Sequence, residues 1–430
     1  MPKKAGKKGQ SMARTVCDRQ PAPNSSARAS SVIRLWSVRM VAEWGMESGL
    51  LREEGYSHVW LAKTLKLPGV VHSGSPAFDA PSVLRAIRRL RDRLDAARPA
   101  PCLPEVLSKN LDAFCELIGL SRLERDLLAL LVIMREEQVF QHVCSNSGEH
   151  TARRLRATLA AALGTEPDAI AKILRTDAPL IQLGLVKIDN TYDYSLTAKV
   201  ELALPGFAET AYGSLVQPID LLGDRLVPAP GTTLQLSDYD HLPDVRSVLL
   251  PFLSTVSRER QGATVLLHGV AGVGKTSLTQ VLARELNAPL YEVAVESNGT
   301  VLSASERCAS WVLAQRLLAN AGACLLFDEF DEVLGLPAQL CDTPVSKSYL
   351  TKKLEAPKAI TFFCLNQLDL DEAYLRRIDV VIGMTPLSAP TRARLISAAS
   401  GGLIDAPVIA SMSRCASITP AIVARARGVV

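Results

Sequence analysis

Nine consecutive residues beginning at Gly269 have the types and spacing of a phosphate-binding loop. The stretch HGVAGVGKTS, residues 268–277, contains the pattern GxxxxGK[ST]. Glycines let such a loop wrap closely, so that backbone N–H groups and the N-terminus of the next helix point at phosphate oxygens. A glycine-rich turn without a ligand is disfavoured, because an apolar strand pattern precedes the loop and a helical pattern follows it. The predicted nucleotide-binding residues are Gly269, Val270, Ala271, Gly272, Val273, Gly274, Lys275, Thr276 and Ser277.

Two residues of this loop have specific chemical roles. Lys275 would neutralise charge on the β- and γ-phosphates of ATP, and the Thr276 hydroxyl would ligate Mg²⁺. A loop of this kind implies binding but not hydrolysis, which needs a second element to hold the metal and activate water.

The stretch ACLLFDEFDE, residues 323–332, has the pattern of that second element. Asp328 and Glu329 follow four apolar residues, which places both carboxylates at the carboxyl edge of a buried strand. We expect Asp328 to hold Mg²⁺ through water and Glu329 to act as general base on the attacking water. Asp331 and Glu332 are interpreted as the acidic start of a helix.

Three downstream residues are further candidates for catalysis. Asn366 ends an apolar run, where its amide could orient the same water. Arg376 and Arg377 precede the next apolar run and could stabilise transition-state charge on a neighbouring subunit's γ-phosphate. The alternative for the arginines is a helix C-terminus, which favours cations through its dipole. Spacing alone does not separate these two interpretations.

Short apolar runs that alternate with helical patterns position these residues. This alternation is typical of a parallel sheet with crossover helices. Continuous apolar runs also fit strands that are buried on both faces. The predicted strands are 264–268, 290–294, 322–327, 359–364 and 378–384. The predicted fold class is therefore an α/β P-loop NTPase with a five-stranded parallel sheet.

Taken together, these motifs resemble those of the AAA+ ATPases, most closely the classical AAA-type domains, over residues 234–430. GVAGVGKT resembles their Walker A motif, LLFDEFDE their Walker B motif, and FFCLNQ their sensor-1 strand with Asn366 as sensor. DEAYLRRID resembles the segment that carries arginine fingers, with Arg376 and Arg377 at the matching positions. The resemblance implies an ATPase in a homo-oligomeric ring, commonly a hexamer, in which each site is completed by the next subunit.

The entry segment LSDYDHLPDVRSVLLPFL also resembles that family. The resemblance places it near the adenine, which makes Tyr239, Asp240 and His241 candidate contacts to the base. The loop VESNGTVLSASER departs from the family because it lacks the aromatic–apolar–glycine triplet that grips a threaded polypeptide.

The end of the chain departs from the family as well. The helical lid, residues 386–430, is short. Ala421 stands about where other branches carry a sensor-2 arginine, and Arg425 comes one turn later. Classical members often lack that arginine, so this departure alone does not disable the site.

The N-terminal half is predicted to be mainly helical. Helical patterns begin near residue 81, and Ser121 with Glu124 has the spacing of a capping box. A hairpin pattern near 185–188 makes the region compatible with a winged-helix module, although 177–183 carries no positive charge for reading DNA. The predicted division is a basic disordered tail at 1–45, a helical domain at 80–204, a linker at 205–233, the nucleotide-binding core at 234–385 and the lid.

Composition excludes several classes of protein. The longest apolar run, Leu127–Met134, is far short of the about 20 residues that cross a bilayer, so no membrane association is expected. Nine scattered cysteines without a CxxC pair predict reduced thiols in the cytoplasm, and no histidine has the spacing of a zinc ligand. Residues 1–40 contain nine Lys or Arg against one Asp, so the net charge of +4 reflects the tail. That tail could touch nucleic acid, act as a presequence, remain solvated, or reflect a start site at Met40 or Met46.

The leading functional hypothesis is an oligomeric ATPase that remodels protein or protein–nucleic acid complexes, with the N-terminal half choosing an unknown client. A DNA-associated ATP switch, as in transposition or loading helpers, is the first alternative. A nucleotide-binding scaffold with weak activity is the second.

Overall fold

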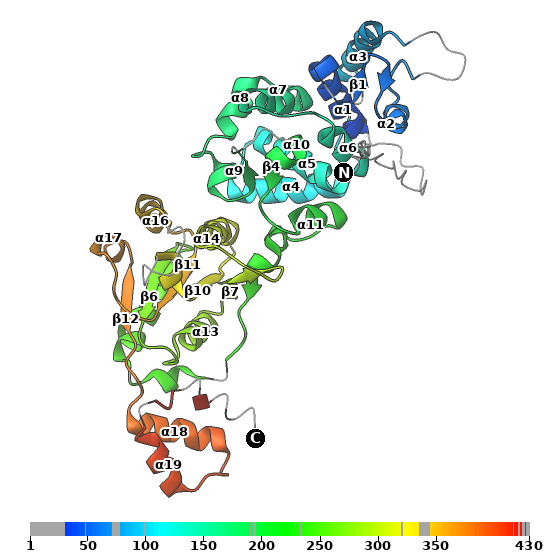
Figure 1. Cartoon of the computed structure of the whole chain (residues 1–430). Coiled ribbons are helices and arrows are strands. Elements are labelled where there is room, and N and C mark those ends of the chain that lie inside the picture. The colour runs from blue at the N-terminus through cyan, green and yellow to red at the C-terminus, as the bar shows by residue number, and fades with distance from the viewer. Residues whose placement is uncertain are drawn as a thin grey trace, which may run out of the picture.

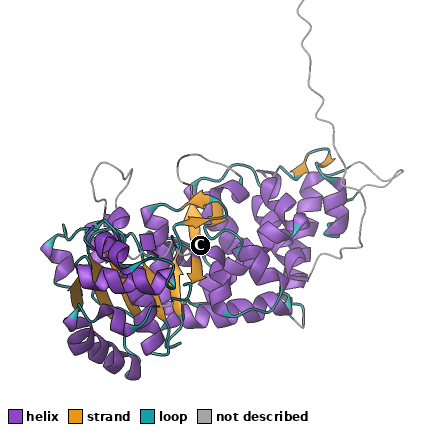
Figure 2. Cartoon of the chain, turned by 90° about the horizontal axis from the view of Figure 1, so that it is seen from below, coloured by secondary structure: helices purple, strands orange, loops and turns teal. Residues whose placement is uncertain are grey.

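The computed structural model describes residues 31–426, except for 48, 71–77, 99, 190, 192–194, 233, 320, 335–344, 416, 420–421 and 424–425. A helical N-terminal part precedes an α/β part that contains a six-stranded sheet. The two parts lie side by side (Figure 1), and in a second view the strands gather on one side while helices fill the other (Figure 2). Within the described residues, no helix has both the length and the apolar character needed to cross a bilayer.

The N-terminal part consists of eleven α-helices and two short hairpins among the described residues. Its helices are α1 (Ser31–Trp44), α2 (Val59–Thr64), α3 (Ala80–Asp95), α4 (Glu105–Ile118), α5 (Arg122–Glu136), α6 (Gln138–Ser145), α7 (Ala152–Leu163), α8 (Pro167–Ile173), α9 (Pro179–Gln182), α10 (Leu196–Lys199) and α11 (Phe207–Gly213). Its antiparallel hairpins are β1 (Leu51–Arg52) with β2 (Gly55–Tyr56), and β3 (Val186–Ile188) with β4 (Val200–Leu202).

The first of these helices corrects the prediction of a disordered tail over 1–45. Residues 31–44 form α1, and Val38 and Met40 on it are fully buried. Arg39 of α1 donates to Asp95 Oδ1 on α3 and to the Ala162 carbonyl on α7, both at 2.8 Å. The prediction was wrong because the positive charge of residues 1–40 masked the apolar spacing of the last ten. Residues 1–30 lie outside the described part of the chain.

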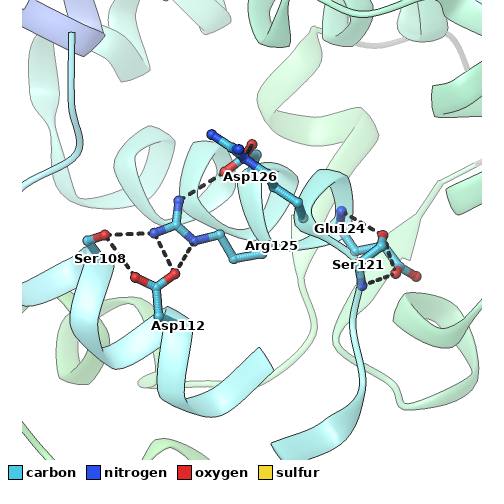
Figure 3. Close-up of polar contacts among 7 residues, drawn as sticks. Ser108, Asp112, Ser121, Glu124, Arg125 and Asp126 are labelled. Carbon is cyan, nitrogen blue, oxygen red and sulfur yellow. Dashed lines mark hydrogen bonds and ion pairs between the residues drawn. The ribbon is translucent and has the colours of Figure 1, made fainter. Parts of the chain in front are cut away.

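The prediction of a mainly helical region beginning near residue 81 is confirmed, and α5 within it is largely buried. Its capping box forms as predicted: the Ser121 backbone N–H donates to Glu124 Oε2 at 2.8 Å (Figure 3). Arg125, one residue later, donates to Asp112 Oδ1 at 2.9 Å and to Asp126 Oδ1 at 2.9 Å. The bond between Arg125 and Asp112 ties the start of α5 to α4.

The α/β part is built around a mostly parallel sheet in the order β12-β6-β11-β10-β7-β5. Its strands are β5 (Leu226–Pro228), β6 (Ala263–His268), β7 (Leu290–Val293), β10 (Cys324–Phe327), β11 (Ile360–Leu365) and β12 (Val380–Gly383). The five predicted strands are confirmed and pair in parallel. A small separate hairpin pairs β8 (Glu296–Ser297) with β9 (Thr300–Val301).

The helical elements of this part lie on both faces of the sheet and beyond it. They are η2 (Pro218–Arg225), η3 (Leu236–Tyr239), η4 (Val245–Leu249), α12 (Leu250–Arg258), α13 (Lys275–Glu285), α14 (Ala304–Leu318), α15 (Phe330–Leu334), α16 (Lys347–Leu354), α17 (Glu372–Leu375), α18 (Ala389–Ser400) and α19 (Ala406–Ser413). The last two form the start of the predicted lid, at the far end of the molecule from α1 (Figure 1).

The prediction of a linker at 205–233 is also wrong. This stretch contains α11, η2 and β5, and β5 pairs antiparallel with β7 as a sixth strand. Its four prolines suggested irregular chain, but Pro218 stands in the first turn of η2 and Pro228 ends the edge strand. Proline is tolerated at both kinds of position.

Alternate residues of the strands face two different apolar cores. On β10, Cys324 and Leu326 join a core with α12 and α13, whereas Leu325 and Phe327 join a core on the other face. That second core continues through α14 into α4 and α5, so it is shared with the N-terminal part. Arg316 of α14 reinforces this contact by donating to the Ile118 carbonyl at the end of α4, at 2.7 Å.

Trp311 of α14 offers a test of this shared core. Its side chain is fully buried, packs edge-on against Phe327 and Phe363, and donates to Thr361 Oγ1 at 3.3 Å. We expect Trp311→Ala to lower the free energy of unfolding by about 3–5 kcal/mol, the cost of such a core cavity. Urea denaturation followed by circular dichroism measures this change. Leu117→Ala on α4, where the side chain is 44% exposed, should change it by less than about 0.5 kcal/mol. Equal effects would contradict the shared core.

Candidate nucleotide-binding site

Three neighbouring strands bring the predicted site residues to one edge of the sheet. β6, β11 and β10 are adjacent and parallel, so their carboxyl ends meet. The glycine-rich loop follows β6, Asn366 follows β11, and Asp328 with Glu329 follows β10. Ligands of open α/β sheets bind at this edge.

The loop itself needs its glycines. Gly272 and Gly274 have φ angles of +81° and +98°, which side-chain-bearing residues rarely adopt. A Cβ at Gly272 would lie 2.8 Å from Thr419 Oγ1, beyond the lid helices. Gly274 is the N-cap of α13 and supplies no side-chain cap. The first N–H groups of α13 are therefore left for a ligand, which is the arrangement that binds phosphate.

Lys275 is held at the mouth of this loop. Its ammonium group donates to the carbonyl of Gly269 at 2.7 Å and to Asn366 Oδ1 at 3.0 Å. The side chain belongs to a buried residue, 8% exposed. The cation and the predicted sensor amide are thus in direct contact, although 91 residues separate them in the chain.

Thr276 and Asp328 form the predicted metal site. Thr276 Oγ1 donates to Asp328 Oδ2 at 2.5 Å. A hydroxyl and a carboxylate are the hard oxygen ligands that Mg²⁺ takes, usually with several waters and phosphate oxygens completing its shell. The donor set therefore fits a magnesium ion.

Glu329, the predicted base, has an unusual backbone. Its φ is +53°, in the left-handed region, and its side chain is exposed at the edge of the sheet. Such strain costs on the order of 1–3 kcal/mol and concentrates at functional sites. The Glu329 N–H donates to Asp328 Oδ1 at 2.9 Å, so the turn that strains Glu329 also orients Asp328. On β7, burial and then the charge of Asp328 raise the pKa of Glu292.

Asp331 also belongs to the site. From the sequence it was interpreted only as part of the acidic start of a helix. It accepts hydrogen bonds from the backbone N–H of Asn366 at 3.1 Å and from Asn366 Nδ2 at 3.4 Å. Burial raises the pKa of Asp331. Asp331 therefore fixes the orientation in which Asn366 meets Lys275. The repeated acidic pair DEFDE was the only available signal for this role.

Arg307 on α14 is a second residue that sequence reasoning missed. Its side chain is 1% exposed and donates to the Asp328 carbonyl at 2.6 Å and to Glu332 Oε2 at 2.9 Å. Its guanidinium carbon lies 4.8 Å from the Phe327 ring centroid, and burial lowers its pKa. Arg307 therefore clamps the strand end that carries both predicted catalytic carboxylates, Asp328 and Glu329. No local pattern marks it, because all its partners lie 20 or more residues away.

The candidate base-contacting residues separate into two groups. Tyr239 is buried, and its hydroxyl donates to the Gly274 carbonyl at 3.2 Å; the His241 ring stacks beside it, with centroids 6.3 Å apart. Both ring nitrogens of His241 are buried without a well-formed hydrogen bond, and burial lowers its pKa. This pair therefore offers an aromatic wall, which suits a nucleotide base. Asp240 instead forms an exposed ion pair with Arg246.

The two candidate finger arginines differ in their surroundings. Arg376 has a side chain that is 68% exposed and pairs with Glu372 on its own helix, at 2.9 Å. Arg377 donates to Glu355 Oε1 and to the Ala373 carbonyl, both at 2.7 Å. Arg377 therefore has two partners within its own chain, whereas Arg376 is largely exposed to solvent. The sensor-2 positions considered above, Ala421 and Arg425, lie outside the described residues.

One family model matches the part of the chain that contains most of this site. Residues 265–386 match the family described as ATPase family associated with various cellular activities (AAA). Lon protease homolog 3, mitochondrial, of Arabidopsis thaliana is 24% identical over 241 residues, which cover 52% of this chain and 24% of that relative. The chain thus spans about a quarter of that relative's length.

Among solved structures, one titled "Structural Basis for Katanin Self-Assembly" aligns at 21% identity and a TM-score of 0.36, covering 47% of this chain and 73% of that chain. The Thermotoga maritima RuvB Holliday junction branch migration motor aligns at 17% identity and a TM-score of 0.34, covering 46% and 64%. Likenesses this low carry no argument about function.

The clamp formed by Arg307 yields a stability prediction. We expect Arg307→Ala to lower the free energy of unfolding by about 2–3 kcal/mol, because it deletes charge-assisted hydrogen bonds to a carbonyl and a carboxylate. Arg258→Ala removes an exposed arginine on α12 and should leave stability within about 0.5 kcal/mol of the parent. Chemical denaturation of both variants makes the measurement. A parent-like Arg307→Ala would show that the clamp does not stabilise the fold.

Proposed function

We propose that this chain, whose residues 265–386 match the family of ATPases associated with various cellular activities (AAA), binds ATP with Mg²⁺ and hydrolyses it to ADP and phosphate as one subunit of a ring. The observation that carries the proposal is the contact between Thr276 and Asp328. The contact between Lys275 and Asn366 lies at the same edge of the sheet. Four side chains from three separate segments meet there with the donors and acceptors that such a reaction needs.

Each of these side chains has a distinct task. The N–H groups of the loop and of α13 bind phosphate oxygens, and Lys275 turns from its own carbonyl partners to neutralise phosphate charge. Thr276 and Asp328 would hold Mg²⁺, which when bound neutralises charge that develops on the phosphates. Tyr239 and His241 would bind the base.

Glu329 and Asn366 act on the attacking water. Glu329 is exposed at the sheet edge and accepts the proton of the water as general base. Asn366, held by Asp331, orients that water through its amide. Arg307 keeps Asp328 and Glu329 in place through the Asp328 carbonyl.

Arg376 is the better candidate for a finger that completes a neighbour's site. It is exposed and bound only to a helical neighbour in an exposed pair, which contributes little to stability. Arg377 is engaged by Glu355 and a backbone carbonyl within its own subunit. The ring is therefore proposed to bring Arg376 to the γ-phosphate of the adjacent subunit.

The energy of hydrolysis is proposed to remodel a client that the N-terminal part selects. The loop that grips polypeptide in related ATPases is here the β8–β9 hairpin, whose Asn298–Gly299 tip has positive φ at both residues. Asp224 of η2 accepts hydrogen bonds from Ser297 Oγ and the Asn298 N–H and so fastens this hairpin. Because this hairpin tip is held in place by Asp224 and carries no aromatic residue to grip a polypeptide, we place client binding elsewhere in the chain.

Two variants separate binding from hydrolysis. Lys275→Ala should abolish ATP binding in calorimetry, because the loop loses the ammonium group that would neutralise phosphate charge. Glu329→Gln should bind ATP like the parent and lose about 10²–10⁴ in turnover, the usual contribution of a general base. Glu285→Gln, which neutralises an exposed carboxylate on α13, is the matched control and should retain parental turnover. Unchanged turnover in Glu329→Gln would assign the base to another residue.

A mixing experiment tests the shared site. Arg376→Ala should bind ATP yet lose on the order of 10³–10⁵ in turnover if the arginine acts as a finger. Mixing it with inactive Lys275→Ala should restore activity, because the mixed ring joins an intact loop to an intact Arg376. Lys275→Ala mixed with a Lys275→Ala/Arg376→Ala double variant should stay inactive. The ring is rejected if the mixture of Arg376→Ala with Lys275→Ala stays inactive while the turnover of the parent rises only linearly with protein concentration.

A further inference from the structure

A cleft of about 900 Å³ lies between the N-terminal part and the α/β part. One wall comes from α9 and the β3 strand, and the other from α14 and the start of α16. The Tyr349 hydroxyl of α16 donates to the Gln182 carbonyl of α9 at 3.1 Å and so bridges the two walls. The nucleotide site described above does not use this cleft.

One wall of the cleft is the edge of a two-stranded sheet. In the β3–β4 pair, the Ala203 N–H donates to the Leu185 carbonyl at 2.9 Å, and the Asp189 N–H donates to the Lys199 carbonyl at 3.0 Å. Hydrogen-bonded residues alternate along an antiparallel strand, so the backbone groups of Val186 and Ile188 point away from β4. Among the described strands none pairs with that edge of β3. An unpaired edge is a template for one more strand.

The side chains around this edge are apolar with a net positive charge. Ile181, Ile188, Ala309 and Val345 are among the apolar residues that line the cleft. Lys187 and Arg225 also line it, against a single carboxylate, that of Glu306. Arg225 is 3% exposed, its Nη2 lies 3.5 Å from Glu306 Oε1, and its Nε has no hydrogen-bond partner.

We propose that this cleft binds an extended segment of a client polypeptide, which adds as a strand to β3. Only an extended backbone offers donors and acceptors at the spacing of Val186 and Ile188. Because neighbouring side chains on a strand face opposite sides, the segment would place apolar residues beside Val186 and Ile188 and carboxylates beside Lys187. The proposal rests on the proposed ATPase function, for which it names the client's chemistry and its site.

Helix α14 would connect this site to the reaction. Glu306 lines the cleft, and the next residue, Arg307, holds the Asp328 carbonyl at 2.6 Å. A strand that displaces Glu306 or Arg225 would therefore act on the residue that clamps the catalytic strand end. Occupation of the cleft should change the rate of ATP turnover.

The test measures the binding of fluorescein-labelled pools of nine-residue peptides to the full chain in the absence of nucleotide. The first pool carries Val, Ile or Leu at odd positions and Asp or Glu at even positions. The second pool is the same but N-methylated at alternate backbone nitrogens, and the third replaces the acids by Lys or Arg. Fluorescence anisotropy should show the first pool binding at least about tenfold more tightly than the other two, because they lose several backbone donors or reverse the charge.

Variants then place the binding on β3. Ile188→Pro removes an outward N–H and leaves the bonds to β4, and proline is tolerated on an edge strand. Lys187→Glu reverses the charge without altering the backbone. Each should weaken the first pool by about fivefold or more, on the order of one hydrogen bond or ion pair. Lys63→Glu, an exposed lysine on α2, should bind like the parent.

Each outcome supports or overturns the proposal. Equal affinity for the first two pools, or parental binding by both Ile188→Pro and Lys187→Glu, overturns strand addition. The proposal is also overturned, in favour of a nucleic acid ligand, if no peptide pool binds and fluorescein-labelled single-stranded DNA binds in a way that depends on Lys187. Parental ATP turnover with no peptide binding refutes the cleft alone, whereas peptide binding with no turnover refutes the proposed ATPase and leaves the cleft standing.

Discussion

A buried guanidinium determines much of how this chain is organised. Arg307 is almost inaccessible to water, and a charge in that position is stable only when hydrogen bonds replace its hydration. The Asp328 carbonyl, Glu332 and the Phe327 ring supply those contacts from the strand and helix that form the acidic half of the site. The same requirement keeps α14 against the sheet, so a solvation constraint on one side chain positions the carboxylates that would act on ATP.

The helix that carries Arg307 also explains why the two parts of the chain form one body. Trp311 and its apolar neighbours fill the face of the sheet that α4 and α5 cover, and Arg316 reaches the end of α4. Nearly every side of α14 is therefore in contact with protein. Helix α14 therefore joins the N-terminal part directly to the strand end that carries Asp328.

Electrostatics at the sheet edge shows a balance between attraction and burial. Burial raises the pKa of Asp331 and of Glu292, and the charge of Asp328 adds to both effects. The charge of Lys275 offsets part of this effect at Asp331, and the charge of Arg307 does so at Glu292. A magnesium ion held by Thr276 and Asp328, as proposed above, would add positive charge beside these carboxylates.

Local sequence patterns determined the loop from Gly269 to Ser277, the five parallel strands and the capped helix at Ser121, because glycine spacing, apolar runs and capping pairs act over a few residues. Only the tertiary structure decided what depends on distant partners. Helix α1 needed α3 and α7 to bury it, and strand β5 needed β7 to pair with it. Arg377 was drawn to Glu355, and Arg307 to Asp328, across 22 and 21 residues. Contacts of that range leave no periodicity in the sequence, since they are formed by the packing of whole elements.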